Sequence, residues 1–163
     1  MTRGLRNNNP LNIRLNNTCW QGMCMEQTDD DFVQFTTMAY GYRAAWRILF
    51  TYFYRFVSQH KPFTVGNIIA RWAPPTENDT RTYIHTMEAL TGIGKAEKLL
   101  PPHIVESYPK LSRLMAAMTT MENGIPMSAV DKDAILEGYR LAFPDACQAL
   151  AEFLTSEDEY KDW

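Results

Sequence analysis

The sequence predicts a single, mainly α-helical domain with a small β element near its N-terminus. Its 163 residues, 45% of them hydrophobic and 21% charged, suit one globular domain and exclude a disordered or low-complexity chain. The first forty residues are rich in Asn and turn formers, whereas apolar residues recur with helical spacing after residue 41. Residues 42–60 are apolar on nearly every side, so we expect a helical bundle around this central helix.

The β element is expected from two short segments. Residues 6–17 are crowded with Asn and contain Pro10, a composition that favours turns and side-chain-to-backbone hydrogen bonds. Residues 12–15 and 32–36 are the strand candidates, and the second shows partial alternation of apolar residues. Gly22 and three consecutive aspartates lie between them, which indicates a loop that joins a small hairpin.

Capping residues and prolines mark where the helices begin and end in the middle of the chain. In chain order these are the stop at Lys61–Pro62, the N-cap Thr64, the stop at Pro74–Pro75, the N-cap at Asn78 or Asp79, and the C-cap Gly92.

Further helices are expected after the pair Pro101–Pro102. They cover residues 103–123, where Pro109 could break the helix, then 128–143 and 144–154, before an acidic end that we expect to fray. We therefore divide the single domain into a motif-bearing region, residues 1–100, and a C-terminal helical extension, residues 101–163.

Charge and hydropathy argue against nucleic acid and membranes as partners. The net charge is −3 and the isoelectric point is about 5.6, so DNA binding through Arg3, Arg6 and Arg14 is improbable. No uncharged apolar run approaches the roughly 18 residues that would predict a membrane span. The N-terminal residues lack the apolar segment of a signal peptide, so we expect synthesis in the cytoplasm without one.

The cysteines and histidines predict no metal site and no cofactor. Cys19 and Cys24 are close enough for a local disulfide and would leave Cys147 over, but we favour three reduced thiols. The three histidines share no ligand spacing with the cysteines or with each other. Residues 92–95 lack the lead glycine and trailing Ser or Thr of a phosphate-binding loop.

The most informative motifs lie in the N-terminal half. Residues 3–14 read RGLRNNNPLNIR, Trp20-Gln21-Gly22 follows, and residues 71–80 read RWAPPTENDT. Over about residues 3–92 the chain resembles a family of phage virion and prophage proteins, usually called structural proteins, which are assigned to the lysozyme-like peptidoglycan hydrolases. The resemblance implies a lysozyme-like fold and cleavage of the peptidoglycan glycan strand, as a muramidase or in the manner of a lytic transglycosylase.

A second resemblance points to the same chemistry. The order of motifs in residues 9–44 is similar to that of bacterial cell-wall glucosaminidases, with an Asn-rich turn, a Trp-x-Gly and an F-x-x-[FY] segment. Those enzymes carry their catalytic glutamate on a helix before the Asn-rich turn. This chain has only about eight residues there, and none is acidic.

Without a signal peptide, these resemblances imply delivery by a phage particle, a lysis system or a contractile secretion machine. The protein would then act at the bacterial cell wall or in the periplasm, or remain associated with the virion. A secreted antibacterial effector would also require a cognate immunity protein that blocks its cleft.

Three acids are candidates for the catalytic carboxylates. Glycoside cleavage needs a proton donor against apolar surface and usually a second carboxylate about 5 to 9 Å away. Glu77 fits the donor best, because it follows Trp72 and the stiff double-proline turn, where we expect it to be buried. Its alternative role is to charge-match the next helix N-terminus. Glu26 is the second candidate donor and Asp29 a candidate second carboxylate, although both could be solvated loop acids.

Sugar binding needs flat apolar faces together with amide and guanidinium donors. The candidate faces and donors are Trp20, Trp72, Tyr83, Asn8, Asn9, Asn12 and Arg14. The alternative is that the asparagines fix a loop through backbone hydrogen bonds and that the tryptophans belong to the core.

Two other functions remain open. The main rival is a non-catalytic virion or assembly protein that keeps a lysozyme-like fold for binding, which the acidic isoelectric point favours somewhat. A Cys/His hydrolase, with Cys19 or Cys24 near His85, is less favoured because nothing in the sequence indicates an activated thiol.

Overall fold

The computed structural model describes residues 1–156 and confirms a mainly α-helical protein. The acidic end that was expected to fray falls largely outside the described residues. None of the described helices is long and apolar enough to cross a membrane. The helices are α1 (Arg3–Arg6), α2 (Met38–Ser58), α3 (Val65–Trp72), α4 (Thr80–Thr91), α5 (Tyr108–Asn123), α6 (Lys132–Ala142) and α7 (Cys147–Ser156), with 3₁₀ turns at Val105–Ser107, Met127–Ala129 and Pro144–Ala146.

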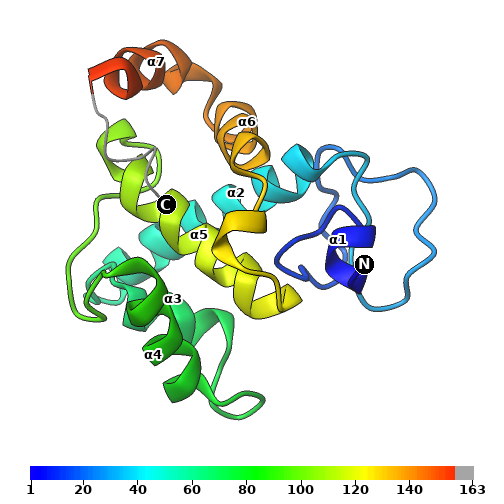
Figure 1. The fold of residues 1–163 in the computed structure, drawn as a ribbon, viewed down its shortest axis with the longest axis horizontal. Helices are drawn as coiled ribbons and strands as arrows, with labels where there is room; N and C mark the ends of the chain where they lie inside the picture. The colour runs from blue at the N-terminus through cyan, green and yellow to red at the C-terminus, as the bar shows by residue number, and fades with distance from the viewer. Residues whose placement is uncertain (157–163) are drawn as a thin grey trace.

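The centre of the bundle is shared by α2 and α5 (Figure 1). α2 packs closely against α6, and α5 lies between α4, α6 and α1. Leu111, Leu114 and Met115 of α5 are completely buried. The prediction that residues 42–60 are buried on nearly every side was wrong for the C-terminal half of α2, because Tyr54 and Val57 are 52% and 54% exposed there. The centre of the bundle is therefore formed by α2 and α5 together and not by α2 alone.

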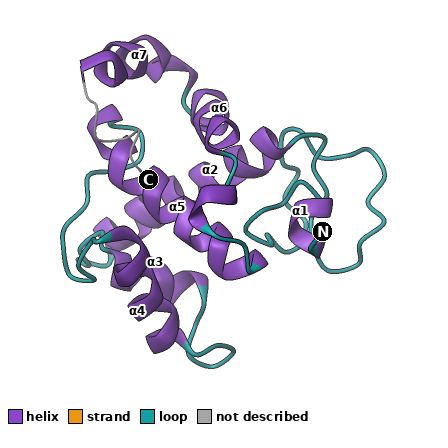
Figure 2. Cartoon of the chain, in the orientation of Figure 1, coloured by secondary structure: helices purple, strands orange, loops and turns teal. Residues whose placement is uncertain are grey.

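The N-terminal β element consists only of isolated bridges, and the cartoon draws this region as loop (Figure 2). Within residues 1–156, the expected strands 12–15 and 32–36 pair at Arg14 with Phe32, and Phe35 bridges to Met23. The buried Asn9 explains why no ladder forms between them. Ile13 N donates to Asn9 Oδ1, and Asn9 Nδ2 donates to Val33 O, each at 2.9 Å. The N–H and the carbonyl that would extend the pairing beyond the Arg14–Phe32 bridge therefore bind Asn9 and not each other.

Local signals placed most helix ends correctly. Thr64 Oγ1 accepts from Asn67 N at the start of α3, Asp79 Oδ1 accepts from Thr82 N at the start of α4, and Gly92 ends α4 with φ +71°. α2 begins earlier than expected, because Thr37 supplies its cap. Pro109 lies in the first turn of α5, where its missing N–H costs no hydrogen bond, so it starts that helix instead of breaking it.

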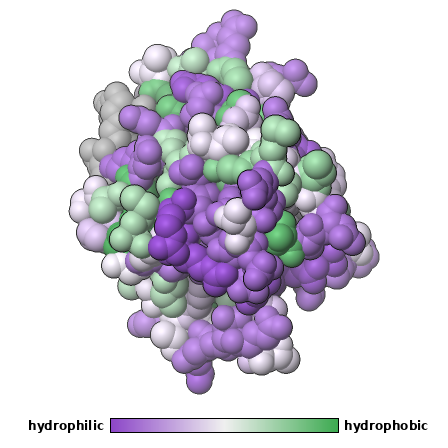
Figure 3. All heavy atoms as spheres, turned by 90° about the vertical axis from the view of Figure 1, so that its right-hand side faces the viewer, coloured by the Kyte–Doolittle hydropathy of each residue, from purple (hydrophilic) through white to green (hydrophobic). Residues whose placement is uncertain are grey.

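The N-terminal segment is fixed to the C-terminal end of α5 across more than a hundred residues of sequence. The Asn123 amide donates to Pro10 O at 2.7 Å, and the Thr2 hydroxyl donates to Asn123 Oδ1 at 2.6 Å. This attachment closes one side of the cleft described below. The face of the molecule that carries the N-terminal loops is mostly hydrophilic, with apolar side chains only in separate small patches (Figure 3).

Candidate active site

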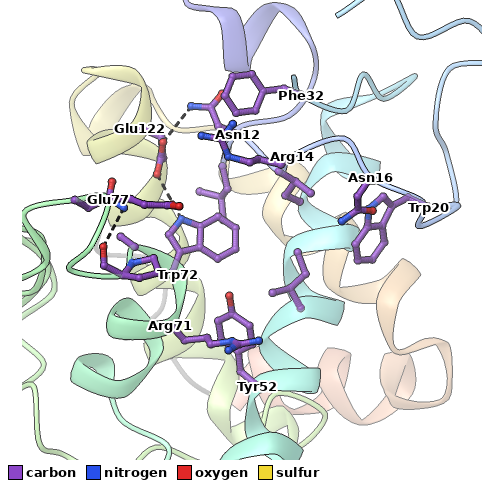
Figure 4. A pocket seen from close by; sticks show the side chains of 16 residues that line it. Asn12, Arg14, Asn16, Trp20, Phe32, Tyr52, Arg71, Trp72, Glu77 and Glu122 are labelled. Atoms are coloured by element: carbon purple, nitrogen blue, oxygen red, sulfur yellow. Dashed lines mark hydrogen bonds between the residues drawn. The ribbon is translucent and has the colours of Figure 1, made fainter. Parts of the chain in front are cut away.

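A cleft of about 530 Å³ lies between the N-terminal loop, α2, α3 and the end of α5 (Figure 4). Its walls combine aromatic rings, two arginines, asparagines and two glutamates. The residues that line it are Leu11, Asn12, Ile13, Arg14, Asn16, Trp20, Phe32, Ile48, Tyr52, Arg71, Trp72, Ala73, Pro74, Glu77, Asn78 and Glu122.

Glu77 lines this cleft, but it is not buried. The turn that carries it is closed by Glu77 N, which donates to Pro74 O at 3.0 Å, directly after α3. The double-proline corner projects from the surface, so the Glu77 side chain is exposed, and the expectation of a buried acid was wrong. Its carboxylate nevertheless belongs to the same cavity as the ring of Trp72.

The other two predicted acids lie elsewhere. Glu26 is exposed and is not among the cleft residues. Asp29 is also outside the cleft, because its carboxylate organises the N-terminal loop. It accepts two hydrogen bonds from the Arg3 guanidinium at 2.6 and 2.7 Å and one from Asn7 at 2.9 Å. These hydrogen bonds, that of Arg3 above all, hold the pKa of Asp29 well below its usual range.

The four predicted polar sugar ligands divide into two pairs. Asn8 and Asn9 fix the N-terminal loop through backbone hydrogen bonds, as the alternative interpretation held. Asn8 Nδ2 donates to Phe35 O at 3.1 Å, and Asn9 Nδ2 donates to Ile13 O at 2.9 Å. Asn12 and Arg14 line the cleft instead. The second pair therefore remains available to a ligand and the first does not.

The predicted aromatic faces divide in the same way. Trp20 and Trp72 line the cleft, with Trp20 at the opposite end from Glu77 in the close view (Figure 4). Tyr83 is only 6% exposed and lies behind the wall, where its hydroxyl donates to Glu122 Oε1 at 3.3 Å. Burial, together with the charge and hydrogen bond of Glu122, raises the pKa of Tyr83.

Glu122 is the functional candidate that the sequence analysis missed. It is half-buried at the end of α5 and accepts hydrogen bonds on both carboxylate oxygens. Asn12 Nδ2 donates to Oε2 at 3.1 Å, and Trp72 Nε1 donates to Oε1 at 3.4 Å (Figure 4). The Tyr83 hydroxyl donates to the same Oε1. One sequence signal was available: Glu122 is the one acidic residue in helix α5.

The described residues offer no metal site and no disulfide. Within residues 1–156, no group of three or more His, Cys, Asp or Glu side chains lies together in a way that could hold a metal ion. Cys19, Cys24 and Cys147 are all free thiols. The polar groups that line the cleft are two carboxylates, neutral amides, two indoles, one phenol and two guanidinium groups.

Comparison with known proteins found a phage relative. The chain is 39% identical over 144 residues to Protein P5 of Pseudoalteromonas phage PM2, an alignment that covers 86% of this chain and 82% of that protein. No family model matches the chain.

Proposed function

This chain belongs to the family of Protein P5 of Pseudoalteromonas phage PM2, and we propose that it cleaves the glycan strand of peptidoglycan, as a muramidase or a lytic transglycosylase. The name of the relative states no activity, so the proposal depends on the cleft. Its main support is that two carboxylates, Glu77 and Glu122, share one cavity with two tryptophan rings. A pair of carboxylates is what glycoside cleavage requires.

The walls of the cleft suit a sugar polymer. Trp20 and Trp72 offer flat apolar faces on which sugar rings can stack. Asn16, Arg14 and Arg71 add amide and guanidinium donors for hydroxyl and acetamido groups. A cavity of about 530 Å³ that is open to solvent accommodates part of a strand and lets the rest extend beyond it.

The phage relative supports delivery with a virion. A protein carried by a phage particle meets the bacterial wall from outside or during lysis, and the site of action would then be the cell wall or the periplasm. The same activity delivered by a secretion machine would make the protein an antibacterial effector, with an immunity protein that covers the cleft as its partner.

The test is release of soluble muropeptides from purified sacculi. We expect release by the unaltered protein and a loss of about 10²- to 10⁴-fold in Glu77→Gln, the range for removal of a general acid or base. Glu26→Gln is the matched control, because Glu26 is an exposed acid outside the cleft. Binding to sacculi with no release by the unaltered protein would reject the proposal in favour of a non-catalytic virion protein.

A further inference from the structure

Glu122 is the more enclosed of the two acids in the cleft, because Glu77 lies on an exposed turn. The Trp72 indole N–H and the hydroxyl of the buried Tyr83 both donate to Glu122 Oε1. A proton that Glu122 gives to a substrate is therefore carried by Oε2.

The two glutamates also lie at opposite kinds of helix end. Glu122 is the penultimate residue of α5, whose last turn holds no basic side chain. Glu77 precedes the first residue of α4, Thr80, by three positions. A helix C-terminus carries partial negative charge and disfavours an anion, whereas a helix N-terminus favours one. Glu122 thus lies at a helix end of partial negative charge, and Glu77 lies ahead of one of partial positive charge.

The Asn12 amide can serve both protonation states of Glu122. Its Nδ2 donates to Glu122 Oε2, while its Oδ1 is buried and has no hydrogen-bond partner within residues 1–156. The two ends of an amide have nearly the same shape. If the Asn12 amide turned by 180°, its Oδ1 would accept a hydrogen bond from a protonated Glu122. The hydrogen bond between the two side chains can therefore form in both protonation states of Glu122.

We propose that Glu122 is the proton donor of the cleft and Glu77 its second carboxylate, an assignment that rests on the proposed glycan cleavage. Glu122 gives its proton to the bridging oxygen, and the C1–O electron pair leaves with that oxygen as a hydroxyl group. A water oxygen bonds to C1, and Glu77 takes the proton that this water loses. Exchange with solvent returns the proton from Glu77 to Glu122, so one water is consumed for each bond cleaved.

The other charged and titratable groups around the cleft do not compete for this role near neutral pH. Arginines stay charged throughout this range. Burial raises the pKa of the Tyr52 hydroxyl, and the pKa of Tyr83 is raised as described. By element, the charged and titratable groups that face Glu122 or the cleft are Arg14 of the N-terminal loop, Tyr52 of α2, Arg71 of α3, Glu77 of the following turn and Tyr83 of α4.

The experiment is the pH profile of muropeptide release for the unaltered protein, Glu122→Gln and Glu77→Gln. We expect a bell-shaped profile for the unaltered protein, because the donor must be protonated and the second carboxylate ionised. Glu122→Gln should lose at least about 100-fold in rate, and its residual activity should lack the fall at high pH. Glu77→Gln should keep that fall and lack the one at low pH.

The outcomes separate this assignment from the proposed function. No release by the unaltered protein rejects glycan cleavage itself. Two outcomes overturn the assignment and leave glycan cleavage standing. One is a rate of release in Glu122→Gln within threefold of that of the unaltered protein. The other is a Glu122→Gln profile that lacks the fall at low pH together with a Glu77→Gln profile that lacks the fall at high pH. Circular dichroism checks the fold of each variant. Should Glu122→Gln not fold, Glu122→Asp must retain the fall at high pH at a rate reduced at least tenfold, and an unchanged rate would again overturn the assignment.

Discussion

Replacement of Gly4 by Ala probes how the N-terminal segment supports the cleft. A Cβ atom at Gly4 would lie 2.8 Å from Asn12 Oδ1, 2.8 Å from Asn123 Oδ1 and 2.9 Å from Asn9 O. Ordinary contacts between carbon and oxygen are about 3.3–3.6 Å, so at least about 0.5 Å of displacement is needed. Because these oxygens belong to the residues that join the N-terminal loop to α5, the displacement cannot remain local.

The expected magnitude follows from two opposing effects. Overpacking of a well-packed site costs about 1–3 kcal/mol, while Ala in place of a helical Gly recovers at most about 1 kcal/mol. We therefore expect Gly4→Ala to lower the free energy of unfolding by about 1–2 kcal/mol. Movement of Asn12 by about 0.5 Å away from Glu122 should also lower the rate of muropeptide release about tenfold, since a misplacement of about 1 Å can cost about 100-fold.

Urea unfolding and muropeptide release measure the two effects. Gly94→Ala is the matched control, because a Cβ there meets no atom of residues 1–156 within 4 Å. It should leave muropeptide release unchanged and raise the free energy of unfolding by at most about 1 kcal/mol. A Gly4→Ala variant with unchanged stability and unchanged release would refute the reasoning that this close approach positions the cleft.

Three further outcomes are expected. Asp29→Asn should destabilise the protein at neutral pH. The lowered pKa of Asp29 stabilises the fold only above the pKa of the unfolded chain, about 4, so the difference in melting temperature between the variant and the unaltered protein should shrink as the pH falls below about 4. Met115→Ala, at a completely buried position, should lower the free energy of unfolding by about 2–5 kcal/mol, and a value under about 1 kcal/mol would contradict the packing described. Trp20→Ala should weaken binding of chitooligosaccharides at least about tenfold by calorimetry, and equal affinity would remove Trp20 from the site. Because Trp20 also packs against the buried Ile13, Val33 and Phe35, the variant should be less stable, and circular dichroism checks that it is folded.

Much of the helical fold could be predicted because its signals are local. A Thr or Asp cap acts on the backbone two or three residues away, and proline acts on its own turn. Thr64, Asp79 and Gly92 therefore marked helix ends that the structure confirms. The β element was harder, because pairing of residues 12–15 with 32–36 depends on what else binds their backbone groups, and Asn9 binds both Ile13 N and Val33 O.

The candidate site was predictable only in part. Glu77 and Trp72 were placed together by their nearness in sequence, and both line the cleft. Asn9 and Asn12 are chemically identical side chains three positions apart, yet one is buried under the loop and the other faces Glu122. No residue pattern distinguishes such neighbours, since the direction of each side chain depends on how the loop turns.

The sequence by itself determined the helical class, the helix ends at Thr64 and Gly92, and the approach of Glu77 to Trp72. Only the tertiary structure decided that Glu122 joins them, because its hydrogen-bond partners Asn12, Trp72 and Tyr83 lie 110, 50 and 39 residues away in the chain. Contacts over such separations depend on how helices and loops pack into one core. That packing is a property of the whole chain, and the one local signal it leaves at residue 122 is that Glu122 is the one acidic residue in its helix.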